Sequence, residues 1–255
     1  MIRELQHFFA ALRFFTRLPV PAWVGHSQQQ LDQAARYFPL VGVIVGGIGA
    51  LVTVAAAWVL PMSLSILAGM SATVLVTGAL HEDGFADAVD GFGGAGDKSR
   101  VLEIMKDSRI GSFGAIAIAL MLLAKFNALA QIEVRGGRAL LVPALIAGHG
   151  ASRLAATALI GALDYVREDD STKSRPLTRR LSAGELGLAA VFGLAPCALL
   201  DRSMVAVALG LTATVTFLAA RYIVHRIGGY TGDCLGATQQ VAELAFYAGL
   251  LCVSS

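Results

Sequence analysis

The stretch HEDGFADAVDGFGG, residues 81–94, places four carboxylates within nine residues of a chain that is otherwise strongly apolar: Glu82, Asp83, Asp87 and Asp90. Of the 255 residues, 56% are hydrophobic and only 15% are charged, whereas a soluble domain carries about 25% charged residues. The mean hydropathy of +0.66 is likewise that of an integral membrane protein. The sequence therefore predicts a bundle of membrane helices interrupted by a strongly acidic segment.

Apolar stretches on both sides of this segment are long enough to cross a bilayer, which takes about 20 mostly apolar residues. We expect an all-α polytopic bundle, a single integral-membrane domain over residues 1–255, with about seven transmembrane helices. The N-terminal segment has Arg13 and Arg17 inside its apolar run, which favours an amphipathic helix in the membrane interface, ending near Pro19 and Pro21. The transmembrane helices are predicted at 38–60, 63–80, 111–131, 139–163, 185–200, 203–224 and 237–254.

The Lys and Arg residues are distributed unevenly between the two sides of this bundle. If the N-terminus lies in the cytoplasm, fifteen of the 20 fall in cytoplasmic segments and three in the outside connections. Because cytoplasmic segments of membrane proteins carry an excess of Lys and Arg, this bias predicts the orientation. It places three polar loops, 81–110, 164–184 and 225–236, on the cytoplasmic face. We therefore expect a multi-pass protein whose active site faces the cytoplasm.

Helical spacing would gather three of the acids. Asp83, Asp87 and Asp90 are spaced i, i+4, i+7 and share one face of a helix, where like charges repel. A hard cation such as Mg²⁺ would relieve this repulsion, and Mg²⁺ commonly binds one or two carboxylates together with substrate phosphates. We predict a divalent metal site at these three residues that presents a phosphate, with the neighbouring glycines giving a ligand close access to the backbone. The alternative is a solvated acidic helix start.

Two further polar motifs lie in the predicted cytoplasmic loops. In DSRIGSFG, residues 107–114, Asp107 is a candidate metal ligand or helix cap, and Arg109 is a candidate for bidentate phosphate contact. In GGYTGDCLGA, residues 228–237, backbone N–H groups of a glycine-rich turn can bind an anion, and Thr231 and Asp233 add a hydroxyl and a carboxylate. The alternative for the second motif is an ordinary turn before a helix.

Isolated polar residues also occur inside the predicted spans. Arg153, next to Ser152, and Glu243 are costly in hydrocarbon and are expected to face the bundle interior. Arg153 either pairs with Glu243 or binds a substrate phosphate. Lys125 lies too near the centre of its span to reach the interface, and His149 is expected to be an interior histidine with its hydrogen bonds satisfied.

Taken together, these motifs resemble those of the cobalamin synthases, the adenosylcobinamide-GDP ribazoletransferases. The resemblance extends along the whole chain and is carried by TRLPVP (16–21), HEDGFADAVDGFGG (81–94), DSRIGSFG (107–114), the pair at 152–153 and GGYTGD (228–233). It implies a multi-pass enzyme of the cell inner membrane that joins adenosylcobinamide-GDP to α-ribazole, or to α-ribazole 5′-phosphate, in the late nucleotide-loop assembly of vitamin B12. It also implies Mg²⁺ as the metal, release of GMP, and adenosylcobalamin or its 5′-phosphate as the product.

The resemblance assigns roles to the motif residues. Asp83, Asp87 and Asp90 bind the metal, and Glu82 is either a further ligand or a group that supports one. Asp107 is a further ligand or the base that takes a proton from the attacking hydroxyl, and Arg109 and Arg153 stabilise phosphate charge. The nucleotide or ribazole site is lined by Ser152, Thr231, Gly232 and Asp233. The expected partners are the two substrates and the lipid bilayer, with no nucleic acid, and a homo-oligomer is left open.

Two rival functions remain at this point. A CDP-alcohol phosphotransferase uses similar chemistry and a comparable acidic helix, but its D-G-x-x-A-R pattern fails here, because no Arg follows Ala86. An ion-coupled secondary transporter would also carry carboxylates. Such transporters often contain two similar halves, and the C-terminal half has no second copy of the acidic motif.

Overall fold

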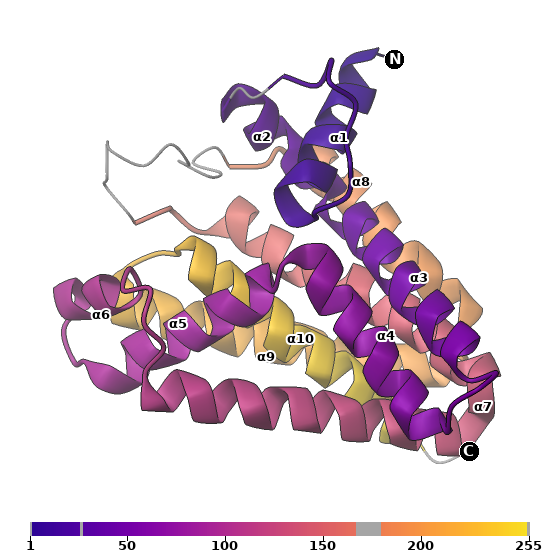
Figure 1. Ribbon diagram of the computed structural model, residues 1–255. Coiled ribbons are helices and arrows are strands. Elements are labelled where there is room, and N and C mark those ends of the chain that lie inside the picture. Colours follow the sequence, from indigo (N-terminus) through magenta and orange to yellow (C-terminus); the bar gives the residue numbers. More distant parts are fainter. Residues whose placement is uncertain (1, 26–27, 167–179, 254–255) are drawn as a thin grey trace.

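The computed structural model describes residues 2–25, 28–166 and 180–253, and over these residues it is helical throughout (Figure 1). An isolated parallel bridge between Tyr165 and Tyr230 is the β-pairing found in this part of the chain. The all-α fold class is confirmed. The elements are α1 (Ile2–Phe15), α2 (Gln28–Ala34), η1 (Ala35–Tyr37), α3 (Phe38–Ala56), α4 (Met62–Thr77), α5 (Leu80–Gly94), α6 (Lys98–Ile104), α7 (Ser112–Ala162), α8 (Ala183–Leu194), η2 (Ala195–Leu199), α9 (Arg202–Ile227) and α10 (Gly232–Leu251).

Long apolar helices give the molecule the character of a membrane protein. In the described residues, three helical segments are long and apolar enough to cross a bilayer: Gln30–Ala56, Ser112–Ala162 and Arg202–Ile227. The pair α4 and α5, bent by 85°, makes a fourth if it counts as one broken span. Large apolar side chains such as Leu51, Trp58 and Phe217 lie exposed on the outside, as contact with lipid requires.

The count of about seven crossings stays a prediction, for reasons visible in particular helices. The two spans expected at 111–131 and 139–163 form one 51-residue element, α7, broken at Gly137, whose φ of 59° and ψ of −159° are not helical. The span expected at 185–200 is the 12-residue α8 followed by η2. The last, at 237–254, corresponds to α10, whose buried face carries Gln239, Gln240 and Glu243.

A sharp bend sets the direction of the acidic segment. Gly78 ends α4 in the left-handed region with φ of 66°, and Ala79 follows with φ of 60°, so α5 leaves at 85° to α4. The segment 81–110, predicted as a loop, is therefore mostly helix, because Phe85, Ala86 and Ala88 of α5 pack into the core. Residues 167–179, most of the predicted loop 164–184, lie outside the described residues.

Close packing of glycines joins α5 to the start of α10. A Cβ added to Gly84 would lie 3.1 Å from the Asp233 Cα, and one added to Gly236 would lie 3.4 Å from the Gly84 Cα. Likewise, a Cβ on Gly91 would lie 3.0 Å from the Val101 carbonyl oxygen. Gly84 and Gly91, expected to give a ligand access to the backbone, also let neighbouring helices approach closely. The consequence is that α5 and the first turn of α10 lie side by side.

The N-terminal helix is present as expected and packs over one end of the bundle (Figure 1). Glu4 of α1 accepts hydrogen bonds from Arg36 at 2.8 Å and from the Tyr37 hydroxyl at 2.6 Å. After α1 ends at Phe15, the Arg17 backbone N–H donates to the Val76 carbonyl at 2.7 Å. The end of α1 is thereby fastened beside the bend between α4 and α5.

Candidate active site

A cavity of about 560 Å³ opens where α1, α5, α7 and α10 meet. Its polar lining combines three carboxylates with two cationic side chains. Its remaining walls are largely aromatic and aliphatic. The polar groups are Asp83, Asp87, Asp233, Lys106 and Arg153, and the aromatic groups are Phe14, Phe15, Phe38, His81, Tyr165 and Tyr230.

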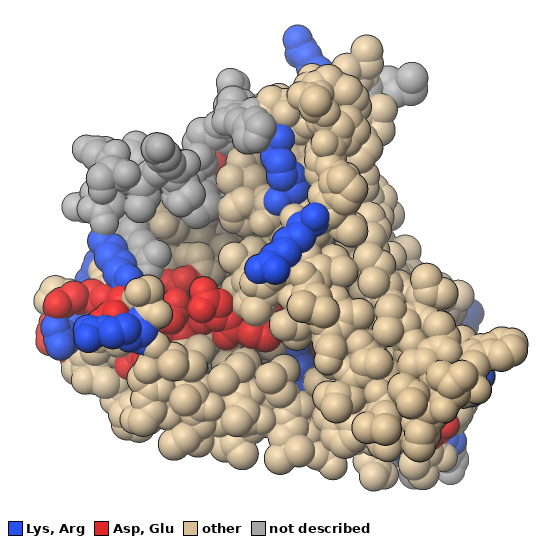
Figure 2. All heavy atoms as spheres, viewed as in Figure 1, with Lys and Arg blue, Asp and Glu red and all other residues tan. Residues whose placement is uncertain are grey.

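The three cavity carboxylates come from two helices. Asp83 and Asp87 lie one turn apart on α5, and Asp233 lies in the first turn of α10. The packing of Gly84 against Asp233 brings the two helices together, so all three carboxylates line the same cavity. Figure 2 shows Asp and Glu side chains gathered along one hollowed part of the surface, bordered by Lys and Arg.

The other two acids of the segment point elsewhere. Asp90 is buried and accepts hydrogen bonds from the backbone N–H groups of Gly111 at 2.7 Å and Gly114 at 2.8 Å. It thus caps the N-terminus of α7, a role that typically stabilises a helix by about 1 kcal/mol. Glu82 accepts a hydrogen bond from Gln240 Nε2 at 3.0 Å and faces the bundle interior. Neither residue lines the cavity.

Asp107 and Arg109 also lie outside the cavity and pair with each other. Arg109 donates to the Asp107 carboxylate from Nε at 3.0 Å and from Nη2 at 2.6 Å, and the side chains are 86% and 39% exposed, respectively. Hydrogen bonds from the Arg109 side chain lower the pKa of Asp107 to about 2. A carboxylate with so low a pKa is a weak proton acceptor at neutral pH. The expected roles of both residues in catalysis remain predictions.

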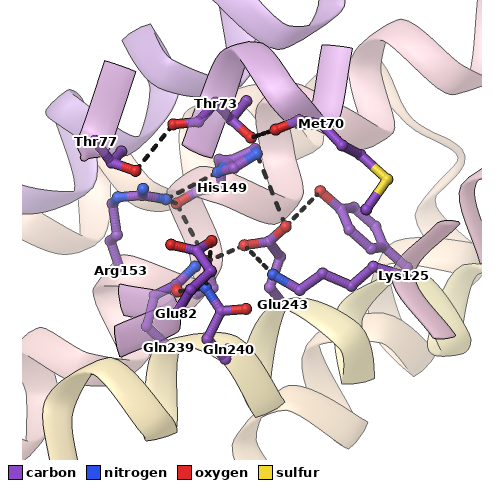
Figure 3. A network of polar contacts seen from close by, with 12 residues as sticks. Met70, Thr73, Thr77, Glu82, Lys125, His149, Arg153, Gln239, Gln240 and Glu243 are labelled. Atoms are coloured by element: carbon purple, nitrogen blue, oxygen red, sulfur yellow. Dashed lines mark hydrogen bonds and ion pairs between the residues drawn. The ribbon is translucent and has the colours of Figure 1, made fainter. Parts of the chain in front are cut away.

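Beneath the cavity lies a network of buried polar side chains (Figure 3). Glu243 of α10 forms an ion pair with Lys125 of α7, with Nζ 3.1 Å from Oε2, and both side chains are about 5% exposed. Glu243 also accepts hydrogen bonds from Gln239 at 2.6 Å and from the Tyr247 hydroxyl at 3.2 Å. Lys125 therefore stays in the bundle interior because its charge is compensated there.

Arg153 reaches this network through His149. Its Nη1 lies 2.9 Å from His149 Nδ1 and 3.2 Å from the His149 carbonyl oxygen, while His149 Nε2 lies 3.8 Å from Glu243 Oε1. The pairing of Arg153 with Glu243 considered from the sequence is thus indirect. Arg153 is 3% exposed, lines the cavity, and its Nε has no hydrogen-bond partner. Arg153 is therefore a buried cation that lines the cavity and can still donate a hydrogen bond.

Of the remaining predicted site residues, two make structural hydrogen bonds and two line the cavity. Ser152 is fully buried; its hydroxyl donates a hydrogen bond to the His149 carbonyl and accepts one from Gln239 Nε2. Thr231 is buried and caps α10, accepting a hydrogen bond from the Cys234 N–H at 3.3 Å. Gly232 and Asp233 line the cavity. The glycine-rich turn therefore contributes to the cavity through its helix start.

Sequence reasoning missed two groups that line the cavity. Lys106 stands in a charged loop where nothing distinguishes it from its neighbours. Phe14, Phe15 and Phe38 read as ordinary apolar residues of the N-terminal region. The only sequence signal was the aromatic density of α1, which is equally typical of an interfacial helix.

The donor set can be compared with the requirements of a divalent metal. Within the described ranges, no group of three His, Cys, Asp or Glu side chains is arranged to hold a metal ion. Asp83 and Asp87 nevertheless lie one helical turn apart on α5 and line the same cavity as Asp233. Mg²⁺ takes oxygen ligands and usually completes its shell with water and substrate phosphates. The residues therefore fit a metal that binds together with a phosphate, held by these carboxylates.

The bundle and its cavity define a class: a polytopic helical membrane protein with an acidic site that also carries cations. Comparison with known proteins then gives the family. The model of the family described as cobalamin-5-phosphate synthase matches residues 7–251. The chain belongs to this family.

Similar proteins cover almost the whole chain. One from Shewanella frigidimarina is 44% identical over 99% of this chain and 96% of its own length, and one from Leptothrix cholodnii is 43% identical over 98% and 97%. A third, from Ralstonia pickettii, is 42% identical over 96% and 95%. All three are named adenosylcobinamide-GDP ribazoletransferase. No solved structure matches the chain.

Proposed function

We propose that this protein transfers the adenosylcobinamide-phosphate moiety of adenosylcobinamide-GDP to α-ribazole, or to α-ribazole 5′-phosphate, and releases GMP. The observation that carries the proposal is the cavity in a chain of this family. Asp83, Asp87 and Asp233 lie in it together with Lys106 and Arg153. A diphosphate needs charge neutralisation of this kind, and an acidic site alone would repel it.

The reaction exchanges one phosphorus–oxygen bond for another. A hydroxyl of the ribazole attacks the phosphorus attached to cobinamide, the bond to the GMP phosphate breaks, and the hydroxyl proton is lost. Catalysis of such a step rests on positioning and on stabilising charge at the phosphoryl oxygens. Arg153 and Lys106 supply fixed positive charge, and a cavity carboxylate accepts the proton.

Mg²⁺ belongs to this proposal as the counterion of the diphosphate. Asp83 and Asp87 would hold it from one helix, and the Asp233 carboxylate on the other helix would remain to accept the proton. When bound, it supplies Lewis-acid polarisation of the phosphoryl oxygens. A bound cation would offset the electrostatic repulsion between the neighbouring carboxylates of the cavity.

We also propose that the protein resides in the cell inner membrane with this cavity open to the cytoplasm. The excess of Lys and Arg in the segments around the cavity supports the orientation. A cytoplasmic opening would give both water-soluble substrates direct access.

The test is GMP release from adenosylcobinamide-GDP by the protein purified in detergent. We expect release that requires both Mg²⁺ and α-ribazole, with the corrinoid product formed in equal amount. Absence of GMP with all components present would overturn the proposal. Release in the absence of α-ribazole would indicate hydrolysis and would contradict the transfer.

A further inference from the structure

Aromatic rings from two helices form one wall of the cavity. Phe14 and Phe15 end α1, and Phe38 begins α3. The Phe15 and Phe38 rings meet edge to face with centroids 4.4 Å apart, and Phe14 stacks on Phe38 at 6.1 Å with 9° between the planes. All three line the cavity; Phe38 is 3% exposed and supports the other two rings, so Phe14 and Phe15 offer most of the aromatic surface to a ligand.

These rings differ from the aromatic residues expected to face lipid. Phe113, Phe217 and Trp58 are 54%, 60% and 82% exposed on the outside of the bundle, whereas Phe14 and Phe15 are half-buried against the cavity. Anchoring in the membrane interface would account for exposed rings. It gives no reason for rings that line an internal cavity.

The aromatic wall lies next to the acidic site along α5. The His81 ring stacks on Phe15 at 5.2 Å with 13° between the planes, and Asp83 and Asp87 follow His81 on the same helix. At 1.5 Å per residue, Asp87 lies about 9 Å along the axis from His81. That span is comparable to a nucleoside, with its base at one end and its ribose hydroxyls at the other.

The chemistry of this end of the cavity discriminates between the rings of the two substrates. Besides the aromatic and charged groups, the cavity is lined by the aliphatic side chains of Leu80, Ala156 and Ile160, and the Thr157 hydroxyl is already donated to the Arg153 carbonyl at 2.7 Å. A guanine edge has several donors and acceptors that hydrocarbon walls would leave unpaired at considerable cost. The benzimidazole base of α-ribazole has no such donors.

We infer that Phe14, Phe15 and Phe38 form the subsite for the base of α-ribazole, which directs the ribose hydroxyl toward Asp83, Asp87 and Asp233. The inference rests on the proposed function and deepens it by assigning one substrate to one wall. Guanosine and the corrin ring then occupy the polar and open sides of the cavity.

Steady-state kinetics of Phe15→Ala test the assignment. Loss of a stacking partner should raise the KM for α-ribazole about tenfold or more, while the KM for adenosylcobinamide-GDP changes less than twofold. Phe15→Tyr should retain the wild-type KM, because it preserves the ring. Phe217→Ala is the matched control, since that ring lies on the outside of the bundle. A KM change confined to adenosylcobinamide-GDP, or an unchanged KM for α-ribazole, would overturn the inference.

A binding measurement separates this inference from the proposed reaction. In Phe15→Trp, the introduced indole should show saturable fluorescence quenching on addition of α-ribazole and none with GMP, in the absence of turnover. Quenching by GMP instead of α-ribazole would assign the wall to guanosine and contradict the inference. If α-ribazole binds but the wild-type enzyme releases no GMP, the proposed function fails while the subsite stands.

Discussion

Asp87 is the residue on which the metal proposal depends most directly, because it lines the cavity one turn from Asp83. Asp87→Asn keeps the size of the side chain but removes one negative charge and one anionic ligand oxygen. We expect a well-folded protein with little GMP release and a raised Mg²⁺ requirement. Initial GMP release measured against Mg²⁺ concentration, with a thermal melt, checks this. A wild-type Mg²⁺ titration in the variant would rule out Asp87 as a ligand.

Asp90 should behave differently, although the sequence grouped it with Asp87. Its two oxygens accept the Gly111 and Gly114 N–H groups, so Asp90→Ala removes a helix cap and should lower stability by about 0.5–2 kcal/mol. The Mg²⁺ concentration for half-maximal activity should stay as in the wild type. Thermal melts and the same titration provide the measurements. A raised Mg²⁺ requirement at unchanged stability would show that Asp90 is a ligand instead.

The contrast shows what the sequence could and could not predict about single residues. Helical spacing indicated that Asp83, Asp87 and Asp90 share one face of a helix, and it correctly placed Asp83 and Asp87 together in the cavity. It could not distinguish Asp90, because the N–H groups it caps lie 21 and 24 residues further along the chain. Lys106 was missed for the same reason: only tertiary packing brings it to the cavity.

At the scale of elements, the crossing of α5 and α10 determines whether the site forms. Gly84→Ala places a Cβ 3.1 Å from the Asp233 Cα. The overpacking, roughly 1–3 kcal/mol, is partly offset by the better helix propensity of Ala, so activity is the sharper readout. A shift of about 1 Å at Asp233 can lower turnover about 100-fold.

Gly47→Ala is the control for this substitution. Gly47 lies inside α3, and an added Cβ would meet nothing within 4 Å. We expect wild-type activity and unchanged or slightly raised stability for this variant. Equal GMP release by the Gly84 and Gly47 variants would show that the crossing tolerates a methyl group and does not position Asp233.

The buried ion pair Lys125–Glu243 joins α7 to α10. Lys125→Met alone leaves a buried carboxylate uncompensated, and Glu243→Gln alone leaves a buried ammonium, so each should cost about 3–5 kcal/mol. Glu243→Gln keeps one acceptor oxygen, which can serve either Gln239 or the Tyr247 hydroxyl, because these two groups donate to different carboxylate oxygens. The double variant should be more stable than the sum of the two predicts, by about 1–3 kcal/mol in unfolding measurements in detergent. Additive effects would mean that the two charges do not stabilise each other.

Hydropathy predicted some helices better than others, and the reason is physical. The helices α3, α7 and α9 show long apolar runs because lipid surrounds much of their surface. Helix α10 is weaker by this measure because its buried face carries Gln239, Gln240 and Glu243, which bond to one another and to α7. The helical character of the acidic segment depended on partners in α7 and α10 and could not be read from its charge.

For the molecule as a whole, the orientation in the membrane is the main prediction. Single cysteines at positions 98 and 138 should react with an impermeant thiol reagent from the cytoplasmic and the periplasmic side, respectively. Cys197 and Cys234 are buried, and Cys252 is exposed, so Cys252→Ser gives the background for labelling in inverted and right-side-out vesicles. Labelling of position 98 from the periplasm would contradict both the orientation and the cytoplasmic cavity.

The order of the helices along the chain has a consequence for how the protein is made. Asp233 and Glu243 of α10 are synthesised after their partners, which are Asp83 and Asp87 in the cavity for Asp233 and Lys125 in the ion pair for Glu243. Because chains emerge from the ribosome N-terminus first, Lys125 is made before Glu243, the residue that compensates its charge. A nascent chain that stops before residue 232 would contain Lys125 without a compensating carboxylate and would lack part of the cavity wall. Such a chain would be a natural target for membrane proteases.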